Sequence, residues 1–261
     1  MTPPRILVTR PAEDAGRLAA LLVERGLEPV GVPAIAIDVE SAAPGVAAML
    51  ASLEDADWLV ITSANGATAV GSQLAGRALP ERLKVAAVGP ATAEALRRRG
   101  IRVDHVPDRY RTGAIADGLG NVEARRVVLA RADAATPELR DILLARGARV
   151  EEVVAYRTVE GPAASRDRLR AELAAGLSGI TFTSGSTVRG LLRLAAQPDR
   201  MRLRALPALC IGPVTADAAA RAGFHVPVVA GTHTTAALAD AVADYFATRR
   251  PRHAREPKGN R

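Results

Sequence analysis

Several short apolar segments of this chain end in a hydroxyl, a glycine or an arginine, and a helix-like segment follows each of them. The first turn of a helix offers N–H groups without partners and the positive end of a dipole, so it can bind an anion. Glycines let an anion approach the backbone, and arginines suit carboxylates. The residues to which we assign this anion-binding role are Arg10, Thr62, Ser63, Gly89, Thr92, Arg131, Thr183, Ser184, Gly185, Gly212 and Thr215.

Each of these residues also has a simpler interpretation. Taken singly, Ser63 and Ser184 are explained by ordinary helix N-caps. Gly-Pro at 89–90 and 212–213 is common turn chemistry, the first-turn threonines could bond to their own backbone, and the arginines could pair with surface carboxylates. These residues occur at equivalent strand ends in both halves of the chain, and this repetition favours a binding site.

The two halves of the chain resemble each other. Two pairs of segments share an offset of 121 residues, and a third pair has an offset of 123 residues. A repeat of this length is a whole domain rather than a solenoid unit. The matching segments are ILVTR at 6–10 with VVLAR at 127–131, LVITSANGATAV at 59–70 with ITFTSGSTVRGL at 180–191, and VGPATAEAL at 88–96 with IGPVTADAA at 211–219.

Apolar strands alternate with amphipathic helices, which indicates parallel sheets covered by helices on both faces. Ligands bind at the carboxyl ends of the strands in such sheets. We expect a helix over 41–56 and extended chain over 29–39 and 149–158. The expected strands are 5–9, 57–61, 84–88, 102–106, 126–130, 179–182, 208–211 and 225–229.

The order of the repeated segments predicts that one domain is inserted into the other. Each domain needs one copy of each of the three matching segments. The strand-helix segment that begins the chain has its counterpart late in the middle of the sequence, so the first domain must combine the two ends of the chain. We predict a first domain of residues 1–36 plus 160–248, a second of 40–150, and a two-stranded connector of 32–40 and 151–160. Polar strand ends of two such domains, facing each other, would form a cleft for a ligand.

The formal net charge of +7 lies mostly in the last residues of the chain. Residues 249–261 hold six Lys or Arg and one Glu, which leaves a net charge of +2 for the rest. This basic tail has no apolar face, so we expect it to be disordered and solvated rather than a nucleic-acid-binding arm. Aromatic residues make up only 3% of the chain, which also disfavours base stacking.

Several classes of protein are excluded or disfavoured. The single cysteine, Cys210, cannot form an intramolecular disulfide or a cysteine metal cluster, and its apolar neighbours predict burial. No apolar run approaches the roughly 20 residues of a membrane span, so we expect a cytoplasmic protein without membrane contact. Motifs for dinucleotides and P-loops are absent, as are paired carboxylates at a strand end and a nucleophile elbow. We predict no metal site, and expect the four histidines to lie on the surface or in loops.

Tyr156, in the segment VVAYRTV, is the one candidate proton donor. A phenol with a pKa of about 10 is a weak acid, yet it can donate a hydrogen bond to a departing hydroxyl group. The alternative is a packing residue between domains with its hydroxyl at the edge. The sequence pattern favours neither interpretation.

The ordered series of motifs resembles the uroporphyrinogen-III synthase family, over residues 5–247. The segments that carry this resemblance are ILVTRP at 6–11, VITSANG at 60–66, AVGPATAEAL at 87–96, VVAYRT at 153–158, ITFTSGSTV at 180–188 and IGPVTADAA at 211–219. The resemblance implies an α/β fold of two flavodoxin-like domains with parallel sheets, joined by a two-stranded connector.

The resemblance also implies an activity. It implies a cofactor-free, monomeric lyase that cyclises hydroxymethylbilane, a linear tetrapyrrole with eight carboxylates, to uroporphyrinogen III with loss of water and inversion of the last pyrrole ring. Tyr156 matches the tyrosine proposed to assist departure of the hydroxyl, and four residues fall in the cleft motifs of the family: Ser63, Thr92, Ser184 and Thr215. The unstable substrate leaves open a transient contact with the preceding pathway enzyme.

Two other functions remain open at this point. A non-catalytic two-domain protein that binds a small anion or a sugar would use the same crevice, and the size of the ligand separates it from the enzyme. A regulatory or nucleic-acid-binding protein would use the basic tail, and truncation at Thr248 would then abolish its function.

Overall fold

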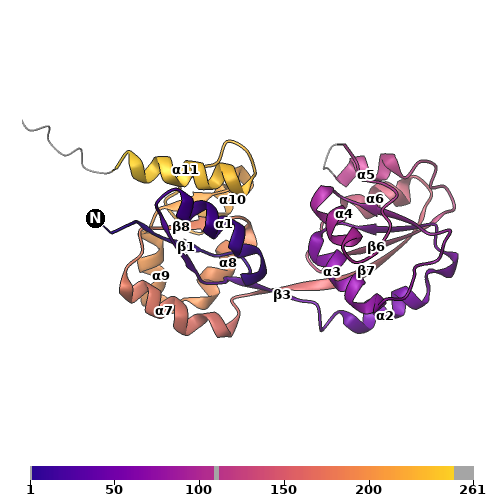
Figure 1. Cartoon of the computed structure of the whole chain (residues 1–261), viewed down its shortest axis with the longest axis horizontal. Helices are drawn as coiled ribbons and strands as arrows, with labels where there is room; N and C mark the ends of the chain where they lie inside the picture. The colour runs from indigo at the N-terminus through magenta and orange to yellow at the C-terminus, as the bar shows by residue number, and fades with distance from the viewer. Residues whose placement is uncertain (1, 109–111, 250–261) are drawn as a thin grey trace, which may run out of the picture. The chain divides into compact units, whose positions relative to one another are not determined.

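A computed structural model describes residues 2–108 and 112–249 of the chain. The chain divides into two compact units, which we call unit 1 (residues 1–36 and 159–261) and unit 2 (residues 37–158). Each unit is built around a five-stranded sheet with helices on both faces (Figure 1). The predicted α/β class with parallel sheets is confirmed.

The sheet of unit 1 has the strand order β10-β9-β8-β1-β2, and every neighbouring pair is parallel. Numbered along the chain within this unit, the order is 2-1-3-4-5, which is the order of flavodoxin-like folds. The strands are β1 (Arg5–Val8), β2 (Glu28–Gly31), β8 (Gly179–Phe182), β9 (Ala208–Cys210) and β10 (Val228–Val229).

Helices cover both faces of this sheet because alternate strand residues point to opposite sides. Ile6 and Val8 of β1 pack in a cluster with α1 (Ala12–Glu24) and α11 (Thr235–Ala247). Leu7, between them, packs in a second cluster on the other face. The helices of that face are α7 (Arg166–Ala175), which follows the 3-10 turn Ala163–Ser165, α8 (Gly185–Leu194), α9 (Gln197–Arg204) and α10 (Pro213–Arg221).

The sheet of unit 2 has the order β3-β7-β6-β4-β5, and the β7–β6, β6–β4 and β4–β5 pairs are parallel. Its strands are β3 (Ile35–Asp38), β4 (Trp58–Ile61), β5 (Lys84–Ala87), β6 (Arg126–Ala132) and β7 (Arg149–Glu160). On one face lie α2 (Ala43–Ala51), the 3-10 turn Leu53–Asp55, α3 (Ala64–Leu74) and α4 (Pro90–Arg97); on the other lie α5 (Thr112–Gly118) and α6 (Glu138–Ala145).

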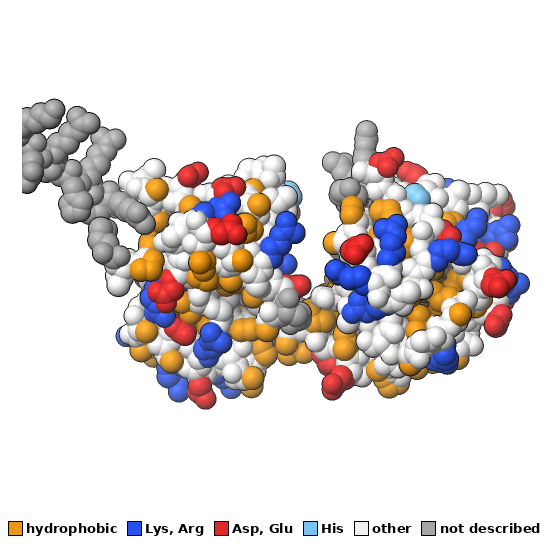
Figure 2. Space-filling model, viewed as in Figure 1, with side chains coloured by type: hydrophobic (Ala, Val, Ile, Leu, Met, Phe, Trp, Pro, Cys, Tyr) orange, Lys and Arg blue, Asp and Glu red, His pale blue; other side chains and the backbone are white. Residues whose placement is uncertain are grey.

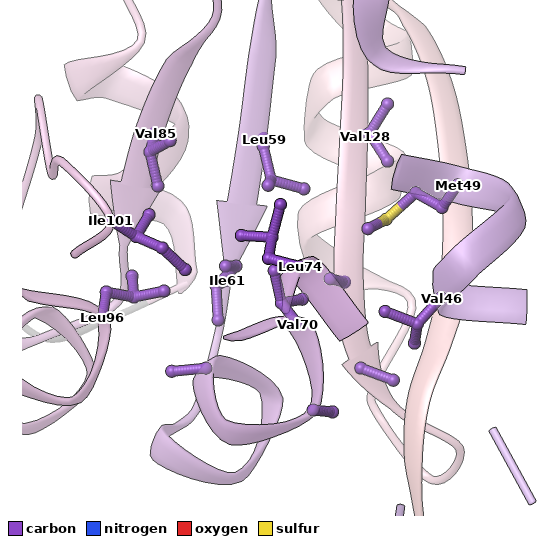
Figure 3. Close-up of a cluster of buried hydrophobic side chains, with 14 of the residues drawn as sticks. Val46, Met49, Leu59, Ile61, Val70, Leu74, Val85, Leu96, Ile101 and Val128 are labelled. Carbon is purple, nitrogen blue, oxygen red and sulfur yellow. The ribbon is translucent and has the colours of Figure 1, made fainter. Parts of the chain in front are cut away.

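Figure 3 shows the core between the sheet of unit 2 and helices α2, α3 and α4. Leu59 and Ile61 of β4 point into it and meet Val70 and Leu74 of α3. None of these four side chains is more than 7% exposed. This packing holds the first turns of α3 and α4 next to the strand ends that they follow.

The sequence repeat is visible in the strand registers. Ile6 of β1 pairs with Gly179 of β8. The residues 121 positions away, Val127 of β6 and Trp58 of β4, pair in the same way. The repeat therefore places equivalent residues at equivalent points of the two sheets.

In unit 1 the edge strand β10 lies next to β9, but among the described residues of unit 2 the equivalent position next to β5 is not taken by a strand. We predicted a strand over 102–106, but the described residues form only an isolated bridge between Ala86 and His105. The carboxylate of Asp104 accepts the N–H of Val85 (2.8 Å), so a side chain takes a donor that a full strand would use.

Other predicted elements are shorter or divided. The helix expected over 41–56 ends at Ala51, where the Ser52 hydroxyl donates to the carbonyl of Met49 (2.9 Å), and a 3-10 turn follows. The extended segment 29–39 divides into β2 and β3, and β10 has only two residues. Helices α7 and α9 lie where we predicted no helix. Apart from Arg249, the predicted disordered tail lies outside the described residues.

The boundaries between the units fall after residues 36 and 158, within β3 and β7. These two strands are neighbours in the sheet order. The chain therefore passes from one unit to the other through two adjacent strands. Over residues 2–108 and 112–249, no helix combines the length and the apolar character that crossing a membrane requires.

Candidate functional site

The Thr-Ser segments after β4 and β8 cap their own helices. The Ser63 hydroxyl accepts from the N–H of Gly66 (3.0 Å) at the start of α3. The Ser184 hydroxyl accepts from the N–H of Thr187 (3.2 Å), and the Thr187 hydroxyl accepts from the N–H of Ser184 (3.4 Å), which completes a capping box. Both serines therefore have the N-cap role that we weighed as their simpler interpretation.

Helices α4 and α10 begin without such a cap. Gly89 and Gly212 are their N-cap residues, with extended backbones (φ −172° and −177°), and neither helix start has a side-chain cap. A proline follows each glycine and adds no N–H group. The remaining N–H groups of both first turns thus keep their capacity to bind an acceptor at the carboxyl edge of each sheet.

Thr92 and Thr215 occupy the third position of these two helices and are almost fully buried, with 3% and 5% of their surfaces exposed. Neither hydroxyl forms a hydrogen bond with another described residue, so the alternative of a bond to its own backbone is not what the structure shows. Neither oxygen is among the fully buried polar atoms that lack a partner, so each hydroxyl keeps accessible surface and can be reached by water or a ligand. Each Gly-Pro helix start therefore combines open N–H groups with a hydroxyl that can still bond.

A pocket of about 280 Å³ in unit 1 brings three predicted site residues together: Thr183, Gly212 and Thr215. It also contains His233, an exposed loop residue before α11 that we had assigned no role. A Cβ atom at Gly212 would lie 2.7 Å from Cδ2 of the His233 ring, so the glycine gives the ring room over the start of α10. Sequence reasoning had no signal for His233, because it lies far along the chain from this glycine.

A pocket of about 190 Å³ in unit 2 brings Thr62 and Arg131 together. Arg131 is only 6% exposed; its guanidinium pairs with Glu152 of β7 and donates to the carbonyl of Thr136. Arg140 approaches the same carboxylate at 3.7 Å. The charge of Arg131 is thus already balanced, and the residue forms a wall of the pocket.

Arg10, the counterpart of Arg131 in unit 1, is held more loosely. It donates to the Thr235 hydroxyl (3.3 Å), and the carboxylate of Asp14 lies 4.0 Å away. Its Nε is buried and has no hydrogen-bond partner among the described residues. Arg10 is therefore less fully paired than Arg131, and 24% of its side-chain surface is exposed.

Tyr156 lies in β7 and is 8% exposed. Its ring belongs to the core of unit 2 that α2, α3 and α4 cover. Its hydroxyl makes no hydrogen bond to any other described residue. The ring thus serves packing, and the phenol remains free to donate.

Cys210 lies in β9 with no exposed surface, as its apolar neighbours predicted. Burial raises the pKa of its thiol to about 12. The thiol is therefore neutral at physiological pH and does not act as a nucleophile.

Comparison with known proteins identifies the family. The family described as "Uroporphyrinogen-III synthase HemD" matches residues 16–240. A "Porphyrin biosynthesis protein HemD" of Ruminiclostridium josui is 31% identical over 90% of this chain and 47% of its own length. The "Uroporphyrinogen-III synthase" of Synechococcus elongatus is 30% identical over 73% of this chain and 74% of its own. The chain thus spans about half the length of the first relative and three quarters of the second.

Two solved structures share the fold. A mutant uroporphyrinogen III synthase from Thermus thermophilus gives a TM-score of 0.63 at 21% identity, over 94% of this chain and 99% of that one. The uroporphyrinogen-III synthetase of Helicobacter pylori 26695 gives 0.61 at 17% identity, over 93% and 99%. With the family match over most of the sequence, these findings lead to one conclusion: the chain belongs to the uroporphyrinogen-III synthase family.

Proposed function

We propose that this chain is a uroporphyrinogen-III synthase, a lyase that converts hydroxymethylbilane to uroporphyrinogen III and water. The observation that carries the proposal is the family match over residues 16–240, together with the two open Gly-Pro helix starts. Helix N-termini with adjacent hydroxyls suit a substrate that bears many carboxylates.

The reaction balances without a co-reactant. The C–O bond of the terminal hydroxymethyl group breaks, and the hydroxyl takes a proton and leaves as water, which gives a protonated azafulvene. The substituted carbon of the last pyrrole attacks it, so that a C–C bond forms in a spiro intermediate. The bond from the spiro carbon to its original methylene bridge then breaks and re-forms at the other α-carbon of this ring, which inverts the ring. That carbon loses its proton, which restores the pyrrole.

The task of the protein is mainly one of orientation. Hydroxymethylbilane also cyclises unaided, to the isomer without ring inversion, so the protein must hold it in the pose that favours the inverted product. We assign carboxylate binding to the starts of α4 and α10, with Thr92, Thr215 and Arg10 as further donors. The other proposed site residues, which line or shape the two strand-end edges, are Thr62, Ser63, Gly89, Arg131, Thr183, Ser184, Gly185 and Gly212.

We assign to Tyr156 a hydrogen bond to the departing hydroxyl group, because its phenol has no partner among the described residues. The proposal invokes no metal and no cofactor. It takes the chain to act as a monomer in the cytoplasm, and to receive its unstable substrate through transient contact with the enzyme that makes it.

The experiment is to supply enzymatically made hydroxymethylbilane and to resolve the product isomers by chromatography after oxidation. We expect the inverted isomer to dominate with the protein and the uninverted isomer to dominate without it. The doubly substituted variant Thr92→Val, Thr215→Val tests the proposed binding residues, and it should shift the mixture toward the uninverted isomer. If the protein yields only the uninverted isomer, the proposed function is wrong.

A further inference from the structure

Unit 2 carries a concentration of positive charge away from the proposed substrate site. Residues 76–102 contain seven Lys or Arg and two Glu, a net charge of +5, whereas the rest of residues 1–248 is net negative. All seven cations are exposed. We call the seven cations of residues 76–102 the basic patch: Arg77, Arg82, Lys84, Arg97, Arg98, Arg99 and Arg102. Figure 2 shows Lys and Arg side chains on the face of unit 2 that is in view, with Asp and Glu side chains among them.

The basic patch is not neutralised by the chain itself. Of its members, only Arg102 has a carboxylate of the described residues within 4.0 Å, that of Asp104 at 2.9 Å. Arg77 donates to carbonyls at the end of α3, and Arg99 donates to the carbonyl of Ala95 in α4 (3.0 Å). Carbonyl partners fix these guanidinium groups in place without removing their net charge.

A pocket of about 380 Å³ with both polar and apolar walls opens within the basic patch, and Glu81 is one of its lining residues. Three arginines of the patch line it: Arg77, Arg99 and Arg102. Its other walls include four apolar side chains with at most 7% exposure: Leu74, Leu83, Val85 and Ile101. Positive charge at the rim and apolar side chains in the walls suit a ligand that has both negative charge and an apolar group.

Gly71 of α3 gives this rim its shape. A Cβ atom at Gly71 would lie 2.1 Å from Cδ of Arg99, so the arginine can cross α3 only where a side chain is missing. A second hydrogen bond, from Arg99 to the Thr68 hydroxyl (3.0 Å), holds it there. The position of Arg99 is thus specified by the residues beneath it.

We propose that this pocket binds an acidic segment of a partner protein that inserts an apolar side chain between the arginines. Buried apolar anchors and charge complementarity at the rim are the usual means of such recognition. Nucleic acid fits less well, because residues 76–102 contain no aromatic ring on which a base could stack. A membrane surface also fits less well, because none of the large exposed hydrophobic side chains lies in the patch.

The pocket lies where α3 and α4 end and β5 begins, which is the amino edge of the sheet. The proposed substrate residues lie at the opposite, carboxyl edge. A partner bound here would leave those residues of unit 2 open, so docking and turnover are compatible. The inference does not depend on the proposed function.

The test uses two fluorescein-labelled peptides, EEEELLEEEE and EEEESSEEEE, which have equal charge. Binding to the full chain is measured by fluorescence anisotropy at low salt. We expect the leucine peptide to bind at least fivefold more tightly, because burial of leucine in the pocket adds to the electrostatic attraction. Equal affinities, or no binding of the leucine peptide up to millimolar protein, would overturn the proposal.

Two variants test the geometry. Arg99→Gln removes a rim charge, whereas Gly71→Ala keeps the charge, favours the helix and displaces Arg99. We expect each to weaken binding of the leucine peptide at least fivefold, while Arg221→Gln, an exposed charge of unit 1, leaves it unchanged. Unchanged binding of the leucine peptide in both pocket variants would contradict the proposal. Tighter binding of a single-stranded oligonucleotide than of the leucine peptide, weakened by Arg99→Gln, would also contradict it.

Discussion

The hydroxyl groups at the strand ends are of two kinds, which differ in whether they have a hydrogen-bond partner. The hydroxyls of Ser63, Ser184 and Thr187 form hydrogen bonds within the first turns of their own helices. The side chains of Thr92 and Thr215 are largely buried, but their hydroxyl oxygens keep accessible surface and have no partner among the described residues. The first kind supports stability, and the second is available to a ligand.

Thr215→Val tests this division. Valine fills the same space without the hydroxyl, so we expect unchanged stability and a loss of about 0.5–1.5 kcal/mol in transition-state binding, or roughly 2- to 10-fold in kcat/KM. Isomer-resolved kinetics and a thermal melt measure the two effects. Thr187→Val is the matched control: it breaks the capping box, so it should lower stability by about 1 kcal/mol and spare kcat/KM. The reverse pattern would remove Thr215 from the site.

Tyr156→Phe removes only a phenol hydroxyl that has no described partner. The ring stays in the core of unit 2, so we expect the melting temperature to be retained. We expect kcat to fall modestly, because departure of the hydroxyl group loses one hydrogen-bond donor. Unchanged kcat would leave the tyrosine a packing role alone.

Cys210 offers a direct check on burial. The raised pKa, about 12, keeps the thiol protonated at pH 8.5 in the folded protein, whereas in the unfolded chain its ordinary pKa makes much of it thiolate. Iodoacetamide should therefore label Cys210 slowly in buffer and rapidly in urea, as mass spectrometry would show. Because only the unfolded thiol ionises above about pH 9, this group lowers stability as the pH rises toward 12. Rapid labelling in buffer would mean that the thiol of Cys210 in β9 is accessible to solvent rather than buried.

The sequence predicted the types of residue at the strand ends but not their partners. Ser63 fits the N-cap pattern because a cap is a local interaction over three residues. The ion pair of Arg131 with Glu152 and the contact of His233 with Gly212 join residues more than 20 positions apart. Local patterns carry no information about such pairs.

At the level of the elements, one glycine shows where a helix must pack closely. A Cβ atom at Gly190 of α8 would lie 2.0 Å from the carbonyl oxygen of Ala34. That carbonyl also accepts the N–H of Gly161 (2.9 Å), so it is not free to move away. The contact fixes α8 against the segment that joins β2 and β3.

We therefore expect Gly190→Ala to lower the free energy of unfolding by about 1–3 kcal/mol, because overpacking outweighs the better helix propensity of alanine. Gly16→Ala in α1 is the control: nothing lies within 4 Å of its Cβ position, so it should stabilise the protein by about 0.5–1 kcal/mol. Urea unfolding measures both. If Gly190→Ala also stabilises the protein, α8 does not pack as described.

The long apolar strands were predictable, whereas edges and polar helices were not. Strands such as β4 are buried on both faces and give a continuous apolar run. Helix α7 fully buries only Leu169, and α9 only Leu203, so neither shows the apolar stripe that identifies a helix. The bridge at His105 replaces a strand because a side chain competes for the backbone donor.

Across the whole molecule, the same sheet is built twice from differently ordered segments. The strand-helix-strand segment β1-α1-β2 opens the chain, while its counterpart β6-α6-β7 closes unit 2. The two arrangements are related by circular permutation, which lets one unit sit inside the other in sequence. Unit 2 is consequently continuous in the chain and unit 1 is not.

This difference predicts which part folds alone. Both hydrophobic clusters of unit 2 draw their residues from the inserted segment, so a fragment of residues 35–160 keeps its entire core and all of β3 and β7. We expect it to unfold cooperatively in urea, as followed by circular dichroism. A fragment of residues 159–249 loses β1, the strand between β8 and β2, and should lack a cooperative transition until residues 1–36 are joined to it. Without β1, strand β8 has an exposed edge. If the fragment 159–249 nevertheless unfolds cooperatively by itself, β1 is not required for the fold of unit 1, and the prediction is wrong.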